Sequence, residues 1–137
     1  MSHHSGSCHC GTVKFSVELT EGFATARRCN CSYCRMRGAV VVSAKLQDLK
    51  ILHGAEHLTR YQFNTKSAQH FFCSRCGIYT HHQRRSKPDE YGINVACLEG
   101  VSPFDFAEIP VVNGTDHPAD RGASTSQVVG TLRYERK

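Results

Sequence analysis

The chain has 137 residues, a formal net charge of +5 and a hydrophobic fraction of 39%. This length fits one domain that buries about two-thirds of the surface exposed by its unfolded chain. No apolar run approaches the about 18 residues of a membrane span, and the opening MSHHSGSCHC carries no apolar targeting segment. These features exclude a transmembrane protein, and we expect a cytoplasmic one with a single domain over residues 1–137.

Short apolar runs predict that the chain is mostly strand. Val13, Phe15 and Val17 alternate with polar residues, which is the period of a strand with one buried face. No segment shows a long helical stripe, so we predict an all-β or nearly all-β fold. Further strands are predicted, in chain order, at residues 38–43, 49–52, 58–63, 71–72, 78–82 and 91–98.

The C-terminal part differs in composition. From about Pro110 onward Gly, Pro, Asp and Asn are frequent, which predicts a loop before a last strand or tail near 128–134. We therefore expect a motif-bearing core over about residues 7–106, with 107–137 as C-terminal loop and tail. His3 and His4 are left out of this fold prediction.

The eight cysteines are the most informative feature of the chain. Seven of them form tight groups and one stands alone: Cys8-x-Cys10, Cys29-x-Cys31-x-x-Cys34, Cys73-x-x-Cys76 and Cys97. A C-x-C or C-x-x-C knuckle aims two thiolates at one point, and two knuckles complete the tetrahedral sulfur shell that Zn²⁺ prefers. Two knuckles therefore close one site, and the triplet is left with three ligands and room for an open fourth position.

Other roles for the cysteines carry less weight. A disulfide framework would have to choose among 105 connectivities and needs an oxidising compartment, which the missing signal segment disfavours. An iron–sulfur cluster is disfavoured because C-x-C-x-x-C matches neither ferredoxin spacing. Cys97 lies in an alternating run with Ile93 and Val95, which favours a small buried hydrophobe. Its alternative role, as fourth ligand to the triplet, stays open.

Four motifs together resemble one known family. They are S-C-H-C-G, R-R-C-N-C-S-Y-C-R, F-F-C-S-R-C-G-I-Y and N-V-A-C-L-E-G, spread from about Ser7 to Phe106. In this order they resemble the glutathione-dependent formaldehyde-activating enzyme family, which also includes centromere protein V. The resemblance implies a single small zinc-binding domain built of β-sheets, of the Mss4-like or β-tent type.

The resemblance also implies the ligands and the reaction. It implies two zinc ions per chain, and glutathione and formaldehyde as the small-molecule partners of a carbon–sulfur lyase with S-(hydroxymethyl)glutathione as product. Two sets of metal ligands are implied: Cys8, Cys10, Cys73 and Cys76 on a structural zinc, and Cys29, Cys31 and Cys34 on a more exposed, catalytic one.

The chemistry limits what such a zinc contributes. A thiol with a pKa of about 8.5 is roughly 3% thiolate at pH 7, so its binding as thiolate gains at most about 30-fold, near 2 kcal/mol. Three cysteine thiolates leave the zinc site negative and a weak Lewis acid. Most of any acceleration must come from holding the aldehyde beside the sulfur. His81 and His82 are candidate proton donors, although an ordinary structural role is favoured for both.

Basic residues surround the triplet: Arg27, Arg28, Arg35 and Arg37. Guanidinium groups suit the two carboxylates of glutathione, and Arg28 and Arg35 are the substrate-binding candidates. Alternatively, these arginines offset the negative zinc–thiolate centre or form a solvated basic face. A second basic run, Arg84-Arg85-Ser86-Lys87, raises nucleic acid as a partner, which the lack of interleaved aromatic residues disfavours.

Two functions follow from these observations. The first is an enzyme that binds glutathione or a similar thiol at an open Cys₃ zinc and promotes its addition to a small aldehyde. The second is a non-catalytic module, in which Cys97 or another side chain closes the second site and the domain acts as thiol carrier, zinc store or interaction unit.

Overall fold

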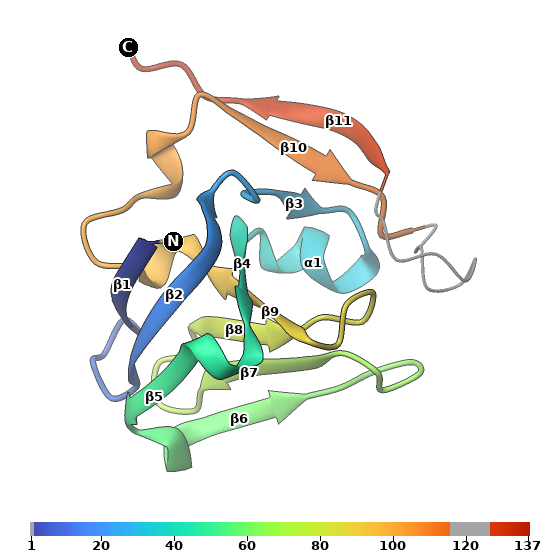
Figure 1. The fold of residues 1–137 in the computed structure, drawn as a ribbon. Helices are drawn as coiled ribbons and strands as arrows, with labels where there is room; N and C mark the ends of the chain where they lie inside the picture. Colours follow the sequence, from blue (N-terminus) through green and yellow to red (C-terminus); the bar gives the residue numbers. More distant parts are fainter. Residues whose placement is uncertain (1, 116–126) are drawn as a thin grey trace.

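The structure is a computed structural model that describes residues 2–115 and 127–137. The described elements are mostly short strands, with one short α-helix and four 3₁₀ turns (Figure 1). The strands are β1 (Ser2–Ser7), β2 (Lys14–Phe23), β3 (Arg28–Cys29), β4 (Val41–Lys45), β5 (Leu49–His53), β6 (Leu58–Tyr61), β7 (Gln69–Cys73), β8 (Tyr79–Gln83), β9 (Glu90–Asn94), β10 (Glu108–Val112) and β11 (Val128–Arg133). The α-helix is α1 (Ser32–Arg37), and single 3₁₀ turns are η1 (Leu46–Asp48), η2 (Ala55–His57), η3 (Val95–Cys97) and η4 (Pro103–Asp105).

The described strands form three sheets. Their orders are β1-β2-β5, β4-β9-β8-β7-β6 and β11-β10-β3. Every pairing is antiparallel except that of β10 with β3. Figure 1 shows the β10–β11 hairpin at the opposite end of the molecule from β6, with α1 between them. This arrangement brings the C-terminal hairpin beside the segment that carries the cysteine triplet.

The main core is built by the inward faces of β2, β4 and β9. Phe15, Val17 and Leu19 alternate along β2 and are buried, as the sequence period predicts. They belong to one cluster with Val42, Ala44, Ile93 and Val95. A smaller cluster contains Cys8, Val13 and Cys73, so the first and last knuckles meet where β2 begins.

The mostly β fold predicted from the sequence is confirmed, and we describe three local differences from that prediction. The strand predicted to reach residue 98 ends at Asn94, whose Oδ1 accepts a hydrogen bond from Ala96 N at 3.1 Å and starts η3. Strand β1 contains His3 and His4, which pair with Glu18 and Val17 of β2.

The third difference is in the C-terminal part. A strand, β10, occupies residues 108–112, where a loop was expected from about Pro110. Pro110 is tolerated there because β3 pairs only with Val111 and Val112, so no neighbouring strand needs the missing N–H on that side. No helix within residues 2–115 and 127–137 combines the length and apolar character that crossing a membrane requires.

Candidate metal centres and the adjoining pocket

Four cysteines from two distant turns form the first candidate metal centre. Cys8 and Cys10 lie in the β1–β2 turn, Cys73 ends β7, and Cys76 lies in the turn that follows it, with all four sulfur atoms within 4.8 Å of one another. The Sγ of Cys10 is 3.7 Å from that of Cys8 and 3.8 Å from that of Cys73. A tetrahedral zinc with Zn–S bonds of about 2.3 Å requires S···S edges of about 3.8 Å. The donor set therefore fits Zn²⁺.

Backbone amides aim at these sulfurs. Val13 N donates to Cys8 Sγ at 3.2 Å, and Arg75 N donates to Cys73 Sγ at 3.4 Å. A sulfur that accepts N–H bonds is stabilised as thiolate, which is the form that binds metal. Cys8 and Cys73 are buried, and all four positions are occupied by protein sulfur, which is typical of a structural zinc.

The triplet forms the second candidate centre, at the junction of β3 and α1. Cys29 ends β3, Cys31 is the N-cap of α1, and Cys34 lies in its first turn. Cys31 N donates to Cys29 Sγ at 3.4 Å, and Cys34 N donates to Cys31 Sγ at 3.3 Å. The N-cap role normally filled by Ser or Asp is taken here by a thiolate-forming side chain.

The three cysteine side chains are linked by hydrogen bonds, and these bonds favour the thiolate form of one of them. Hydrogen bonds from Cys29 and Cys34 lower the pKa of Cys31, while the bond to Cys29 is the main cause of the raised pKa of Cys34. One thiolate thus forms readily and its neighbours retain their protons. A divalent metal would displace those protons and bind all three sulfurs.

Arg37 joins the triplet to the five-stranded sheet. Its Nη2 donates to Cys34 Sγ at 3.2 Å, and its Nη1 donates to His70 Nδ1 at 2.9 Å. The guanidinium also lies over the ring of Tyr79 at 3.7 Å from the centroid. Because arginine only donates, His70 accepts at Nδ1 and is neutral, and burial followed by the charge of Arg37 lowers the pKa of His70 to about 4.

A short C-terminal segment, Val112–Thr115, closes the triplet from the other side; we call it the strap. The strap is held by Asn30, whose N–H donates to Val112 O at 3.2 Å and whose Oδ1 accepts from Gly114 N at 2.7 Å and Thr115 N at 3.2 Å. A Cβ on Gly114 would lie 2.7 Å from Cys31 Cβ and closer still to Cys29 Sγ. Only glycine therefore allows this approach of the backbone to the ligand loop.

The triplet forms part of the wall of a pocket of about 400 Å³. This volume lies within the range of small-molecule sites. The strap forms another part, and Phe63, His70 and His82 add ring surfaces, with His70 and His82 stacked at 5.2 Å. Four arginines line the same pocket: Arg27, Arg37, Arg84 and Arg85. The pocket thus combines candidate metal ligands, aromatic surface and positive charge.

The other predicted residues differ in where they lie relative to this pocket. Arg28 and Arg35 are not among the residues lining this pocket, so their substrate role stays a prediction. His81 is buried against Phe71, whereas His82 lines the pocket and places Nδ1 2.6 Å from the Tyr79 hydroxyl. Burial lowers the pKa of His82 well below its ordinary value. Cys97 belongs to neither cysteine group; its Sγ donates to Tyr79 O at 3.5 Å.

Several residues that build the site were not identified from the sequence. Asn30 and Gly114 are 84 positions apart, so no local pattern connects them. His70 carried a usable signal: it stands on a predicted strand edge close to the aromatic residues Phe71 and Phe72. Phe63 lies at the end of a predicted strand, and its ring stacks on those of Tyr61 and His70.

Comparisons with known proteins agree with this arrangement. A sequence model described as "Glutathione-dependent formaldehyde-activating enzyme" matches residues 3–108. A Halomonas elongata protein named "Putative glutathione-dependent formaldehyde-activating enzyme" is 38% identical over 79 residues, 52% of this chain and 50% of that protein. The chain thus spans about half the length of this curated relative. A crystal structure of a Rhodobacter sphaeroides protein is 62% identical, with a TM-score of 0.77, covering 78% of this chain and 98% of that one.

Proposed function

Because the chain belongs to the glutathione-dependent formaldehyde-activating enzyme family, we propose that it promotes the addition of glutathione, or a similar thiol, to formaldehyde or another small aldehyde. The observation that carries the proposal is the triplet of Cys29, Cys31 and Cys34 in the wall of the 400 Å³ pocket. Three protein sulfurs facing a pocket leave a position where a substrate sulfur can be held beside an aldehyde.

The proposed metal is zinc, two ions per chain. Cys8, Cys10, Cys73 and Cys76 would hold the structural ion, and the triplet would hold the other. When bound at the triplet, zinc supplies a site at which a substrate thiol stays in its thiolate form at neutral pH. The protein's own groups do the rest, by orienting the two reactants and limiting water in the pocket.

The reaction is balanced without a further reagent. The sulfur lone pair forms the C–S bond, the C=O π pair moves to oxygen, and that oxygen takes up one proton for the one lost by the thiol. The product is S-(hydroxymethyl)glutathione, which places the enzyme with the carbon–sulfur lyases. His82 lines the pocket, and the Tyr79 hydroxyl 2.6 Å from its Nδ1 fixes the ring orientation, so His82 is a candidate to position the aldehyde oxygen.

The proposal places the protein in the cytoplasm and assigns it no nucleic acid or membrane partner. Zinc-binding thiolates survive in a reducing compartment, where structural disulfides are rare. The rival function, a non-catalytic module with two closed zinc sites, needs a fourth side chain on the triplet. Within residues 2–115 and 127–137, no Cys, His, Asp or Glu joins the three sulfurs, which supports the open site.

The test compares Cys31→Ala with the parent protein. We expect a folded variant that retains one zinc, binds no glutathione by calorimetry and adds nothing to the rate of hemithioacetal formation. Because formaldehyde and thiols also combine unaided, the rate is measured by exchange spectroscopy against the uncatalysed background. Cys97→Ala, which removes a cysteine outside both groups, is the matched control and should exchange like the parent.

A parent protein with no exchange above background and no glutathione binding would contradict the proposal and favour the non-catalytic module. Exchange that persists in Cys31→Ala would contradict the role given to the triplet.

A further inference from the structure

Two arginines from separate parts of the chain meet at one hydroxyl in the pocket wall. Arg27 precedes β3, Arg84 follows β8, and both line the pocket that contains the triplet. Arg27 Nη1 lies 3.1 Å from Ser43 Oγ and Arg84 Nη1 lies 3.5 Å from the same oxygen. Ser43 is in the middle of β4 and is buried. The hydroxyl therefore holds two guanidinium groups side by side.

Among the described residues, the basic groups of this wall outnumber the carboxylates that pair with them. Glu90 pairs with Arg84 at 2.6 Å, and it also lies 3.3 Å from Lys87 and 3.8 Å from Lys45. Arg27 makes no ion pair with any carboxylate of the described residues. Two like charges held together in a sheltered wall destabilise each other unless an anion joins them.

Arg27 also keeps donors for a ligand. The Nη1 atom of Arg27 donates the two hydrogen bonds that this side chain makes, one to Thr25 O at 3.0 Å and one to Ser43 Oγ. Within the described part of the chain, its Nη2 atom has no hydrogen-bond partner. A guanidinium presents its two N–H groups in a fork that matches the two oxygens of a carboxylate. Arg27 is two residues before Cys29 in an extended segment, so both side chains project from the same face.

We propose that Arg27 and Arg84, held by Ser43, form a subsite for a carboxylate of the thiol substrate. The subsite makes the pocket selective for anionic thiols over neutral ones. This proposal rests on the proposed function, because the subsite orients the thiol that takes part in that reaction. A thiol anchored here by its carboxylate has its sulfur held against the triplet, which lines the same pocket.

The test measures binding without the reaction and without a free thiol. S-Methylglutathione is titrated into the zinc-loaded parent, Arg27→Lys, Arg84→Lys and Ser43→Ala proteins by calorimetry. Each lysine keeps the positive charge but not the fork, and we expect at least tenfold weaker binding in both. Ser43→Ala removes the hydroxyl that both guanidinium groups share and leaves their other contacts in place, so it should weaken binding by a smaller factor. Melting curves show which variants keep the fold.

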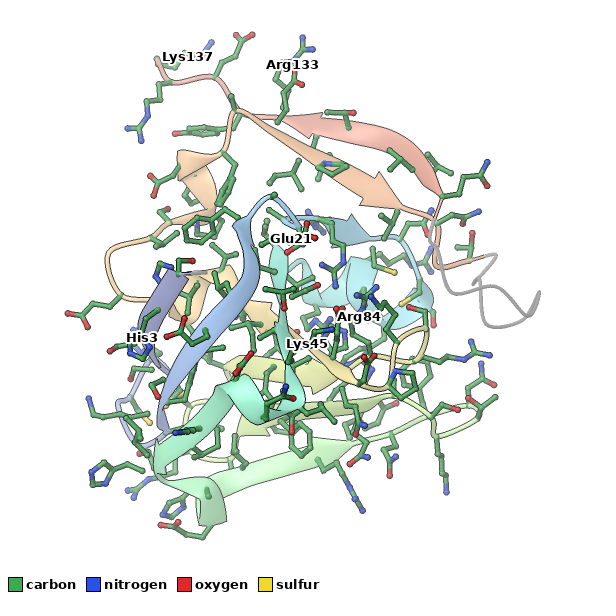
Figure 2. All side chains as sticks on the ribbon, in the orientation of Figure 1. His3, Glu21, Lys45, Arg84, Arg133 and Lys137 are labelled. Atoms are coloured by element: carbon green, nitrogen blue, oxygen red, sulfur yellow. The ribbon has the colours of Figure 1, made fainter. Side chains whose placement is uncertain are left out.

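Two controls complete the experiment. Arg133→Ala removes a positive charge from β11, which Figure 2 shows well apart from Arg84, and should leave the affinity unchanged. The diethyl ester of S-methylglutathione carries no carboxylate; it should bind the parent at least tenfold more weakly and lose nothing further in Arg27→Lys.

Three results would overturn the subsite: no binding of S-methylglutathione to the parent, an ester that binds as well as the acid, or unchanged affinity in folded Arg27→Lys and Arg84→Lys. Its failure is distinguishable from failure of the proposed function. Accelerated exchange with unchanged affinity in both lysine variants refutes the subsite alone. Carboxylate-dependent binding without accelerated exchange refutes the reaction alone.

Discussion

At the scale of single residues, Arg37 is the side chain on which the triplet most depends. It contacts Cys34 Sγ, His70 Nδ1 and the face of Tyr79 at once. A zinc bound by three thiolates carries a net charge of about −1. The guanidinium offsets that charge from within the protein, and its fixed plane sets the direction of the Cys34 sulfur.

We predict that Arg37→Lys loosens the second metal without unfolding the chain. Lysine keeps the charge but cannot bond Cys34 and His70 together, and a hydrogen bond to a charged group contributes about 1.5–3 kcal/mol. We therefore expect the zinc affinity of the triplet to fall by about 10- to 100-fold, measured by competition with a chromogenic chelator. Arg35→Lys, at an exposed position of the same helix, is the control and should behave like the parent.

Cys97 gives a second prediction at this scale. Its side chain is buried, and burial is the main cause that raises its pKa to about 12, so it remains a neutral thiol. Cys97→Ala should leave both zinc ions in place and lower the free energy of unfolding by about 1–2 kcal/mol through lost packing. Metal content by elemental analysis and a denaturant titration measure the two effects. Loss of one zinc would show that Cys97 is a ligand after all.

The neighbours Arg27 and Arg28 show where sequence reasoning ends. In an extended segment adjacent side chains point to opposite faces, so only one of the two can line the pocket. The sequence shows that arginines flank the triplet, but the face toward the pocket depends on the pairing of β3 with β10. That pairing joins residues 28–29 to 111–112 and leaves no local pattern.

At the scale of elements, the strap determines how open the triplet is. Its backbone lies against Cys29 and Cys31, and Asn30 fixes it with two hydrogen bonds to its side chain. The strap and α1 thus enclose the ligand loop from two sides. The triplet is consequently more rigid than three ligands within six residues would be alone.

We predict that Gly114→Ala displaces the strap while the sheets stay intact. The new methyl group would overlap Cys29 Sγ, and moving the strap away breaks the bonds to Asn30. Zinc at the triplet should then exchange at least several-fold faster, while the free energy of unfolding changes by no more than about 1–2 kcal/mol. Gly130→Ala, at a roomier position of β11, is the control. Equal exchange rates in both variants would contradict the role of the strap.

The strands and knuckles were predictable because their signals are local. Alternation of Val13, Phe15 and Val17 requires only one buried face, and each Cys-x-x-Cys turn lies within a few residues. β10 was not predicted, because Pro110 and nearby glycine weigh toward a loop, whereas the pairing with β3 and β11 outweighs that preference. Tertiary pairing of this kind overrides local composition.

At the scale of the whole molecule, the two cysteine centres have different mechanical roles. The four-cysteine site brings together the β1–β2 turn and the end of β7. Cys10 and Cys73 are 63 positions apart in the sequence, so a metal bound there would link two sheets. The triplet takes all its sulfurs from β3 and α1. We therefore expect a metal at the first centre to stabilise the fold, and one at the second to exchange ligands without unfolding it.

We predict about two zinc ions per chain, and we expect the one at the four-cysteine site to be required for folding. Cys73→Ser should leave the chain unfolded at 37 °C, with no cooperative thermal transition, because the binding free energy of a structural zinc is folding free energy. A chelator added to the parent should remove one equivalent before the other, since the triplet offers one ligand fewer. Elemental analysis and a timed chelator assay measure these values. Simultaneous release of both ions, or a normal melt for Cys73→Ser, would reverse the assignment.

The position of the strap affects any attempt to shorten the protein. Residues 3–108 match the family model, whereas the strap and β10, apart from its first residue, lie beyond that limit. A chain cut at residue 108 would keep every cysteine and both candidate zinc sites, yet lose the partner strand of β3 and one side of the pocket. Such a fragment would keep all the candidate ligands, yet without the strap it should hold metal at the triplet less tightly than the intact protein does. Domain limits taken from sequence matches would thus remove a part of the molecule that encloses the candidate site.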